Sequence, residues 1–116
     1  MKAFLSYASE QKDLANALAQ RLKNAGIGVF FDRDSIAPSD PFDKFIRQGI
    51  ADADIFVFLA SPDSLRPGAY TLTELGLAQE RWPAASGRVI TVLIGGLTVE
   101  SLPNYLRSVS VLQPEG

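Results

Sequence analysis

The 116-residue sequence contains neither cysteine nor histidine. Without cysteine there can be no disulfide and no thiolate nucleophile. Without histidine, neither a Ser-His triad nor an ordinary zinc site can form. Catalysis by this chain would therefore depend on carboxylates, hydroxyls and backbone groups, and we expect no metal site.

A concentration of charge of one sign is also missing. Eleven Lys and Arg residues against 13 Asp and Glu residues give a formal net charge of −2. Domains that bind nucleic acids need a concentrated positive surface, so we expect no nucleic-acid partner. The first six residues turn polar too early for a signal peptide, and no apolar run approaches the ~20 residues of a membrane span. These features predict a cytoplasmic protein with no membrane partner.

The chain alternates between strand-like apolar runs and amphipathic helical segments. Its length fits one domain. The expected strands cover residues 2–6, 27–31, 55–60, 89–94 and 109–112, with helical segments in the connections. Right-handed crossovers between parallel strands place helices on both faces of a sheet. We therefore predict a flavodoxin-like α/β fold with a central parallel sheet of about five strands flanked by helices.

The first and third helical segments carry the clearest patterns. In the first, Leu14, Leu18 and Leu22 recur every four residues and predict an apolar face, with Ser9 as N-cap and Gly26 at the C′ position. In the third, an apolar stripe ends at Trp82, which we expect to cover the core.

Ligands of open parallel sheets bind outside the carboxyl ends of the strands, where the strand order reverses. Residues 6–9, 32–41, 61–68 and 95–97 are expected at that edge. None of them contains the glycine-rich phosphate-binding patterns of Rossmann enzymes or P-loop NTPases. The first and third strands end in Ser6-Tyr7 and Ala60-Ser61, which lack the acidic residues of phospho-acceptor receiver domains.

Four short segments resemble Toll/interleukin-1 receptor (TIR) domains of the bacterial and plant NADase type: residues 4–7 (FLSY), 28–32 (GVFFD), 36–40 (IAPSD) and 61–64 (SPDS). The resemblance implies a single TIR domain over residues 1–116, the N-terminal part of a longer protein with a fused C-terminal sensor domain. It also implies a role in prokaryotic immunity against phage. Other copies of the domain are the implied partners, in an open head-to-tail assembly that activates the enzyme.

The resemblance further implies an NAD⁺ nucleosidase, which cleaves the nicotinamide–ribose bond to give nicotinamide and ADP-ribose or a cyclic product. NAD⁺ is then the substrate, and no cofactor is implied. The family's catalytic glutamate follows a W-x-x-x-E pattern; here Glu74 takes that position and Tyr70 replaces the tryptophan. The substrate-binding residues implied at the strand ends and nearby are Ser6, Tyr7, Ser9, Asp32, Phe42, Ser61 and Tyr70.

Each of these residues also has a structural interpretation. By periodicity alone, Glu74 borders the apolar stripe of its helix as a solvated residue, and Ser9 is explained by capping. Asp32 could tie the backbone of its loop, and Phe42 fits a core position. Two other functions stay open: a non-catalytic module for TIR–TIR association, and an enzyme similar to nucleoside deoxyribosyltransferases, which break C–N glycosidic bonds with a glutamate.

Overall fold

The computed structural model describes residues 1–30, 42–66, 70–83, 87–94, 97–98, 100, 102–107 and 110–112. The side chains of residues 9, 42–45, 70, 104, 107 and 110–112 lie outside this description. The elements in chain order are β1 (Lys2–Ser6), the 3-10 turn η1 (Ser9–Gln11), α1 (Lys12–Asn24), β2 (Gly28–Phe30), α2 (Phe42–Asp52), β3 (Ile55–Ala60), α3 (Tyr70–Arg81), β4 (Val89–Leu93), α4 (Asn104–Arg107) and β5 (Ser110–Leu112).

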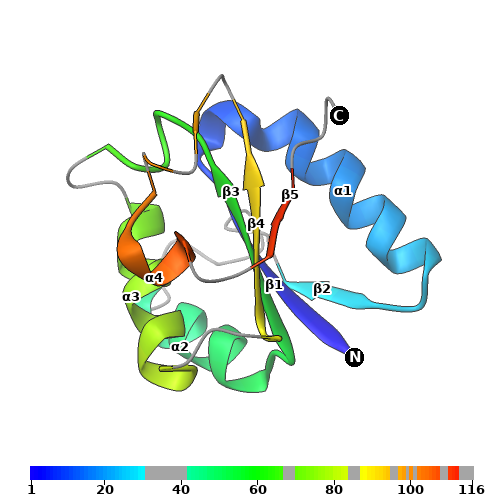
Figure 1. Cartoon of the computed structure of the whole chain (residues 1–116). Coiled ribbons are helices and arrows are strands. Elements are labelled where there is room, and N and C mark those ends of the chain that lie inside the picture. The colour runs from blue at the N-terminus through cyan, green and yellow to red at the C-terminus, as the bar shows by residue number, and fades with distance from the viewer. Residues whose placement is uncertain are drawn as a thin grey trace.

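The described strands form one parallel sheet in the order β2-β1-β3-β4-β5. This is the flavodoxin-like order, and it confirms the predicted fold class and strand number. The chain runs outward from β1 to β2, then returns past β1 to β3, so the order reverses between β1 and β3. In Figure 1 the carboxyl ends of β3 and β4 point to the upper edge of the sheet.

The two faces of the sheet are covered unequally. Figure 1 shows α1 on one face and α2, α3 and α4 on the other. Side chains alternate between the faces: Leu5 and Val57 pack on the α1 side with Ala15, whereas Phe4 and Phe56 belong to the larger cluster under α2 and α3. Only strand side chains on the same face as Phe4 and Phe56 can therefore contact α3.

A row of aromatic rings brings α2 close to the sheet. Phe30, Phe4 and Phe56 occupy paired positions on three neighbouring strands, and their rings stack at centroid distances of 5.2 and 5.5 Å. Gly49 of α2 lies directly over this row, because a Cβ there would come within 3.0 Å of the Phe30 ring and 3.1 Å of the Phe4 ring. A side chain at position 49 would thus make the rings shift by a few tenths of an ångström, and glycine permits this close approach of helix and sheet without such a shift.

The predicted apolar face of α1 is rotated in the structure. Ala15 and Ala19 are fully buried, whereas Leu14 is 36% exposed. Small residues are buried because they let the helix approach the sheet closely, and this leaves Leu14 at the margin of the contact. Gly26 does take a positive φ of 86°, with hydrogen bonds to helix carbonyls from its own N–H and from that of Ile27.

The prediction that Ser9 caps α1 is wrong. The 3-10 turn η1 precedes the helix, and the N-cap position is Gln11, whose side chain makes no capping hydrogen bond. The Gln11 side chain is instead the acceptor for the Ser61 hydroxyl, at 2.9 Å. The entry to α1 is thus shaped by a contact with the loop after β3, which the local sequence does not show.

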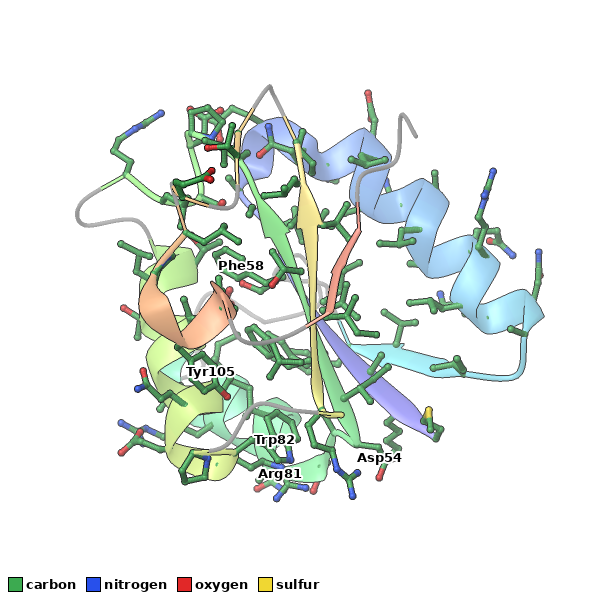
Figure 2. The ribbon with its side chains drawn as sticks, in the orientation of Figure 1. Asp54, Phe58, Arg81, Trp82 and Tyr105 are labelled. Carbon is green, nitrogen blue, oxygen red and sulfur yellow. The ribbon has the colours of Figure 1, made fainter. Side chains whose placement is uncertain are left out.

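The last turn of α3 is fixed by α4. The Tyr105 hydroxyl donates a hydrogen bond of 2.6 Å to the Trp82 carbonyl, and the Arg81 guanidinium lies 4.7 Å from the Trp82 ring centroid (Figure 2). Burial raises the pKa of the Tyr105 hydroxyl that donates this bond. Trp82 is 9% exposed within the core cluster, as expected from the sequence.

No helix in the described part of the chain is both long and apolar enough to span a membrane.

Candidate functional site

A hydrogen bond joins the candidate catalytic glutamate to the end of β1. The Ser6 hydroxyl donates to Glu74 Oε1 at 2.8 Å, across 68 positions of sequence. Ser6 is the last residue of β1, and its side chain lies on the α3 side of the sheet because it alternates with Leu5 and Tyr7. The Glu74 carboxylate therefore lies at the carboxyl end of β1, beside the point where the strand order reverses.

Glu74 lies within the buried face of α3, and the expectation that it borders the apolar stripe is corrected. Thr71, Glu74, Leu75 and Ala78 follow the i, i+3, i+4, i+7 spacing of one helix face, and all four are buried. Glu74 itself is 2% exposed. A carboxylate so far removed from water is rarely found without hydrogen-bond partners or a functional role.

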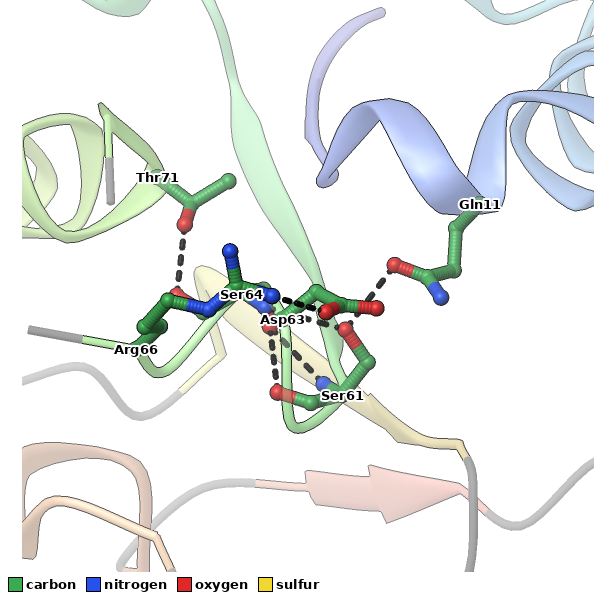
Figure 3. A network of polar contacts seen from close by, with 6 residues as sticks. All are labelled: Gln11, Ser61, Asp63, Ser64, Arg66 and Thr71. Atoms are coloured by element: carbon green, nitrogen blue, oxygen red, sulfur yellow. Dashed lines mark hydrogen bonds and ion pairs between the residues drawn. The ribbon is translucent and has the colours of Figure 1, made fainter.

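The loop after β3 is fixed by its own hydroxyl groups (Figure 3). The Ser61 N–H donates to Ser64 Oγ at 2.8 Å, and the Ser64 N–H donates to Ser61 Oγ at 3.0 Å. The Ser61 hydroxyl then donates to Gln11 Oε1, and the Thr71 hydroxyl donates to the Ser64 carbonyl at 2.5 Å. This Ser61–Thr71 network connects the start of α1, the end of β3 and the first turn of α3, three residues before Glu74.

The contacts described for Tyr7 and Ser61, the other predicted site residues with described side chains, are with residues other than Glu74. Tyr7 is 5% exposed and packs with α1 on the opposite face of the sheet from Glu74. Ser61 is fully buried, and its hydroxyl proton is donated to Gln11, so it could donate to a substrate only if that bond broke. The predictions for Asp32 and for the side chains of Ser9, Phe42 and Tyr70 fall outside the described residues.

Two residues of this edge were not singled out by the sequence: Gln11 and Thr71. Ser64 belongs to the 61–64 segment (SPDS) that carries the TIR resemblance. The hydroxyl spacing of Ser61 and Ser64 was a usable signal, since Ser side chains three residues apart commonly bond each other's backbone in a turn. Nothing local indicates that Gln11 would reach a residue 50 positions away.

No group of three or more acidic side chains that could hold a metal ion occurs among the residues with described positions. A cavity of about 330 Å³ lies at the other end of the sheet, lined by Lys2, Gly28 and Phe30 of the strands and Gly49 and Asp52 of α2, among others. This cavity does not include Ser6 or Glu74. The candidate site is therefore a buried polar contact at the strand ends, separate from that hollow.

The TIR resemblance of the four sequence segments is supported along nearly the whole chain. A family model described as TIR domain matches residues 3–113. The chain belongs to the TIR domain family. The predicted family is thereby confirmed, and the flavodoxin-like sheet with Ser6 at the end of β1 is the TIR fold of this chain.

Solved structures show the same fold. The TIR domain of the Toll-related receptor TRR-2 from Hydra magnipapillata has a TM-score of 0.77 at 20% identity, covering 97% of this chain and 82% of that chain. A metazoan TIR-STING receptor from C. gigas has a TM-score of 0.76 at 22% identity over 94% of this TIR domain, which spans only 36% of the receptor chain. A CMP N-glycosidase from Clostridium botulinum, BcmB, has a TM-score of 0.65 at 21% identity, covering 100% of this chain and 90% of that chain. No protein with a curated description matches this TIR domain.

Proposed function

We propose that this TIR domain is an NAD⁺ glycohydrolase of a prokaryotic immune protein, and that Glu74 is its catalytic residue. The observation that carries the proposal is the buried Glu74 carboxylate, which Ser6 holds at the carboxyl end of β1. Ligands of this sheet topology bind outside that edge. The fold is also shared with an N-glycosidase of a nucleotide, which is a likeness of architecture alone.

The reaction fits a site with one carboxylate. The bond between ribose C1′ and the nicotinamide nitrogen breaks, and its electron pair neutralises the pyridinium, so the leaving group needs no proton. Ordinary glycoside hydrolysis needs a second carboxyl group as general acid, whereas this reaction does not. Positive charge develops on the ribose, and the fixed Glu74 carboxylate would stabilise it. Water then adds to C1′ and releases a proton to solvent, giving ADP-ribose; attack by a ring nitrogen of the substrate's own adenine would give a cyclic product.

The burial of Glu74 implies a second requirement. With 2% of its surface exposed, the side chain cannot touch a ribose until the atoms that cover it move aside. We therefore assign the described conformation to a resting state, which opens when copies of the domain assemble head to tail. Such control suits an enzyme whose substrate is an essential cellular dinucleotide, and a fused sensor domain would supply the trigger.

The test is NAD⁺ consumption by the unaltered chain and by Glu74→Gln, followed by release of nicotinamide. Glutamine keeps the size of the side chain and removes its charge, so the rate is expected to fall ~10²–10³-fold. Glu80→Gln is the matched control, because Glu80 is exposed on the same helix and lines a surface hollow away from Ser6. All three proteins are compared at concentrations at which they self-associate equally.

The alternatives predict different outcomes of the same assay. Equal NAD⁺ cleavage by the unaltered chain and Glu74→Gln would remove Glu74 from the mechanism. No cleavage at any state of assembly would leave a non-catalytic module for TIR–TIR association. CMP and a 2′-deoxynucleoside are assayed in parallel, because faster cleavage of either would favour a nucleoside-directed glycosidase or deoxyribosyltransferase over an NAD⁺ enzyme.

A further inference from the structure

Position 6 is a polar exception on an apolar surface. The neighbouring side chains on the same face of β1 and β3, Phe4, Phe56 and Phe58, are apolar and at most 1% exposed. Ser6 is itself 1% exposed, so its hydroxyl has lost its contact with water. A buried hydroxyl lowers stability unless it is hydrogen-bonded, and here its partner is Glu74.

We propose that Ser6 is a positioning residue for catalysis, which holds the Glu74 carboxylate in the orientation that the developing ribose cation requires. This inference rests on the proposed NAD⁺ glycohydrolase function and adds a role for Ser6 that does not involve contact with the substrate. The hydroxyl donates to Oε1 and so fixes one oxygen of the carboxylate to the end of a central strand.

The physical basis is the flexibility of a glutamate side chain. Glu has three rotatable side-chain bonds, and restricting them costs up to ~2 kcal/mol of conformational entropy. Because Ser6 already holds the Glu74 side chain in the folded state, that entropy is lost on folding and not when the substrate binds. Ser6 pairs with Phe58 of β3, the middle strand of the sheet, and this pairing anchors the bond at the end of β1.

Positioning acts on the transition state more than on binding. A misplacement of about 1 Å can reduce a rate ~10²-fold, because the stabilisation of charge depends on where the carboxylate lies. Loss of the Ser6 hydroxyl should therefore lower kcat roughly 10- to 100-fold while KM changes little. A residue that only stabilises the fold would alter the fraction of active enzyme and leave the kcat of the folded fraction unchanged.

The experiment compares Ser6→Thr with Ser6→Val in the full chain. The two side chains have nearly the same shape, and only threonine keeps the hydroxyl. Both variants are characterised for folding and self-association, and kcat and KM for NAD⁺ are measured per folded chain. Ser6→Thr is expected to retain most of the activity, and Ser6→Val to show the fall in kcat.

Thr91→Val is the control for removing a buried hydroxyl elsewhere. Thr91 lies on the same register row and the same face, two strands from Ser6. It is fully buried, and its hydroxyl has no hydrogen-bond partner in the described part of the chain. Its replacement should leave kcat and KM unchanged.

The outcomes separate this inference from the function on which it rests. If the unaltered chain cleaves NAD⁺ and Glu74→Gln does not, but Ser6→Thr and Ser6→Val behave alike, the positioning role is refuted and the glycohydrolase stands. If the unaltered chain does not cleave NAD⁺ when assembled, both proposals fail. Should Ser6→Val not fold, Ser6→Ala replaces it, since alanine adds no volume; full activity of that variant would likewise overturn the role of Ser6.

Discussion

Ser6 and Thr91 show how differently a buried hydroxyl can be used. Both side chains lie on the α3 side of the sheet, in one row that also contains Phe58. The Ser6 hydroxyl donates to Glu74, whereas that of Thr91 has no partner among the residues with described positions. A buried polar group that has lost water without gaining a partner reduces stability by about 1–3 kcal/mol. A substitution at position 91 can therefore raise the stability of the fold without altering the candidate site.

We predict that Thr91→Val stabilises the protein. Valine replaces the hydroxyl with a methyl group of similar size, so no cavity is left beside Phe58, with which Thr91 pairs. The free energy of unfolding, measured by urea denaturation, should rise by about 1 kcal/mol. A decrease of similar size would show that the Thr91 hydroxyl is hydrogen-bonded, for instance to a buried water molecule.

At the scale of elements, the Ser61–Thr71 network fixes the start of α3. The Thr71 hydroxyl donates to the Ser64 carbonyl, and Thr71 is 1% exposed. Glu74 follows one turn later on the same face of the helix. A shift of the first turn of α3 would therefore move Glu74 relative to Ser6.

We predict that Thr71→Val destabilises the protein by about 1–3 kcal/mol, because it leaves the buried Ser64 carbonyl without this donor. Thr73→Val is the matched control: it makes the same change in the same helix at an exposed position, so the difference in helix propensity cancels. Urea denaturation of both variants gives the difference in free energy of unfolding. Equal stabilities would show that the bond from Thr71 contributes nothing to the fold.

The elements themselves were predictable because their signals are local. The apolar run from Ile55 to Ala60 became a central strand, and the glycine at position 26 ended α1 as expected. The errors came from contacts between distant parts of the chain. Packing of α1 on the sheet selected Ala15 and Ala19 over Leu14. The N-cap position of α1 is Gln11, whose side chain contacts Ser61, and not the expected Ser9.

The site was predictable in part for the same reason. The resemblance to TIR domains pointed to Glu74, and the strand ends pointed to Ser6, but no pattern paired the two residues across 68 positions. Their contact depends on the side-chain alternation of β1 and on the rotation of α3, which only the assembled core determines. The same alternation placed Tyr7 on the other face, although it is next to Ser6 in sequence.

At the scale of the whole molecule, fold and candidate site impose opposite demands. The fold buries Glu74 to 2% exposure, which excludes water and strengthens electrostatic interactions around it. The proposed reaction requires that a ribose reach the same group. One conformation cannot satisfy both demands, so activity requires a change of conformation, which under the proposed function is brought about by assembly.

We therefore predict that NAD⁺ cleavage per chain rises with protein concentration. A domain activated by head-to-tail association is inactive when dilute, and its specific activity increases over the concentration range in which sedimentation shows larger species. Molecules that open independently of one another would instead give a specific activity that does not change with concentration. Mixing active chains with Glu74→Gln gives a second test of activation by assembly. The variant should assemble as the unaltered chain does. Added to dilute active chains, it should raise their activity, because it completes assemblies without itself cleaving NAD⁺. A constant rate per active chain in both experiments would refute activation by assembly and leave local opening as the route of the substrate to Glu74.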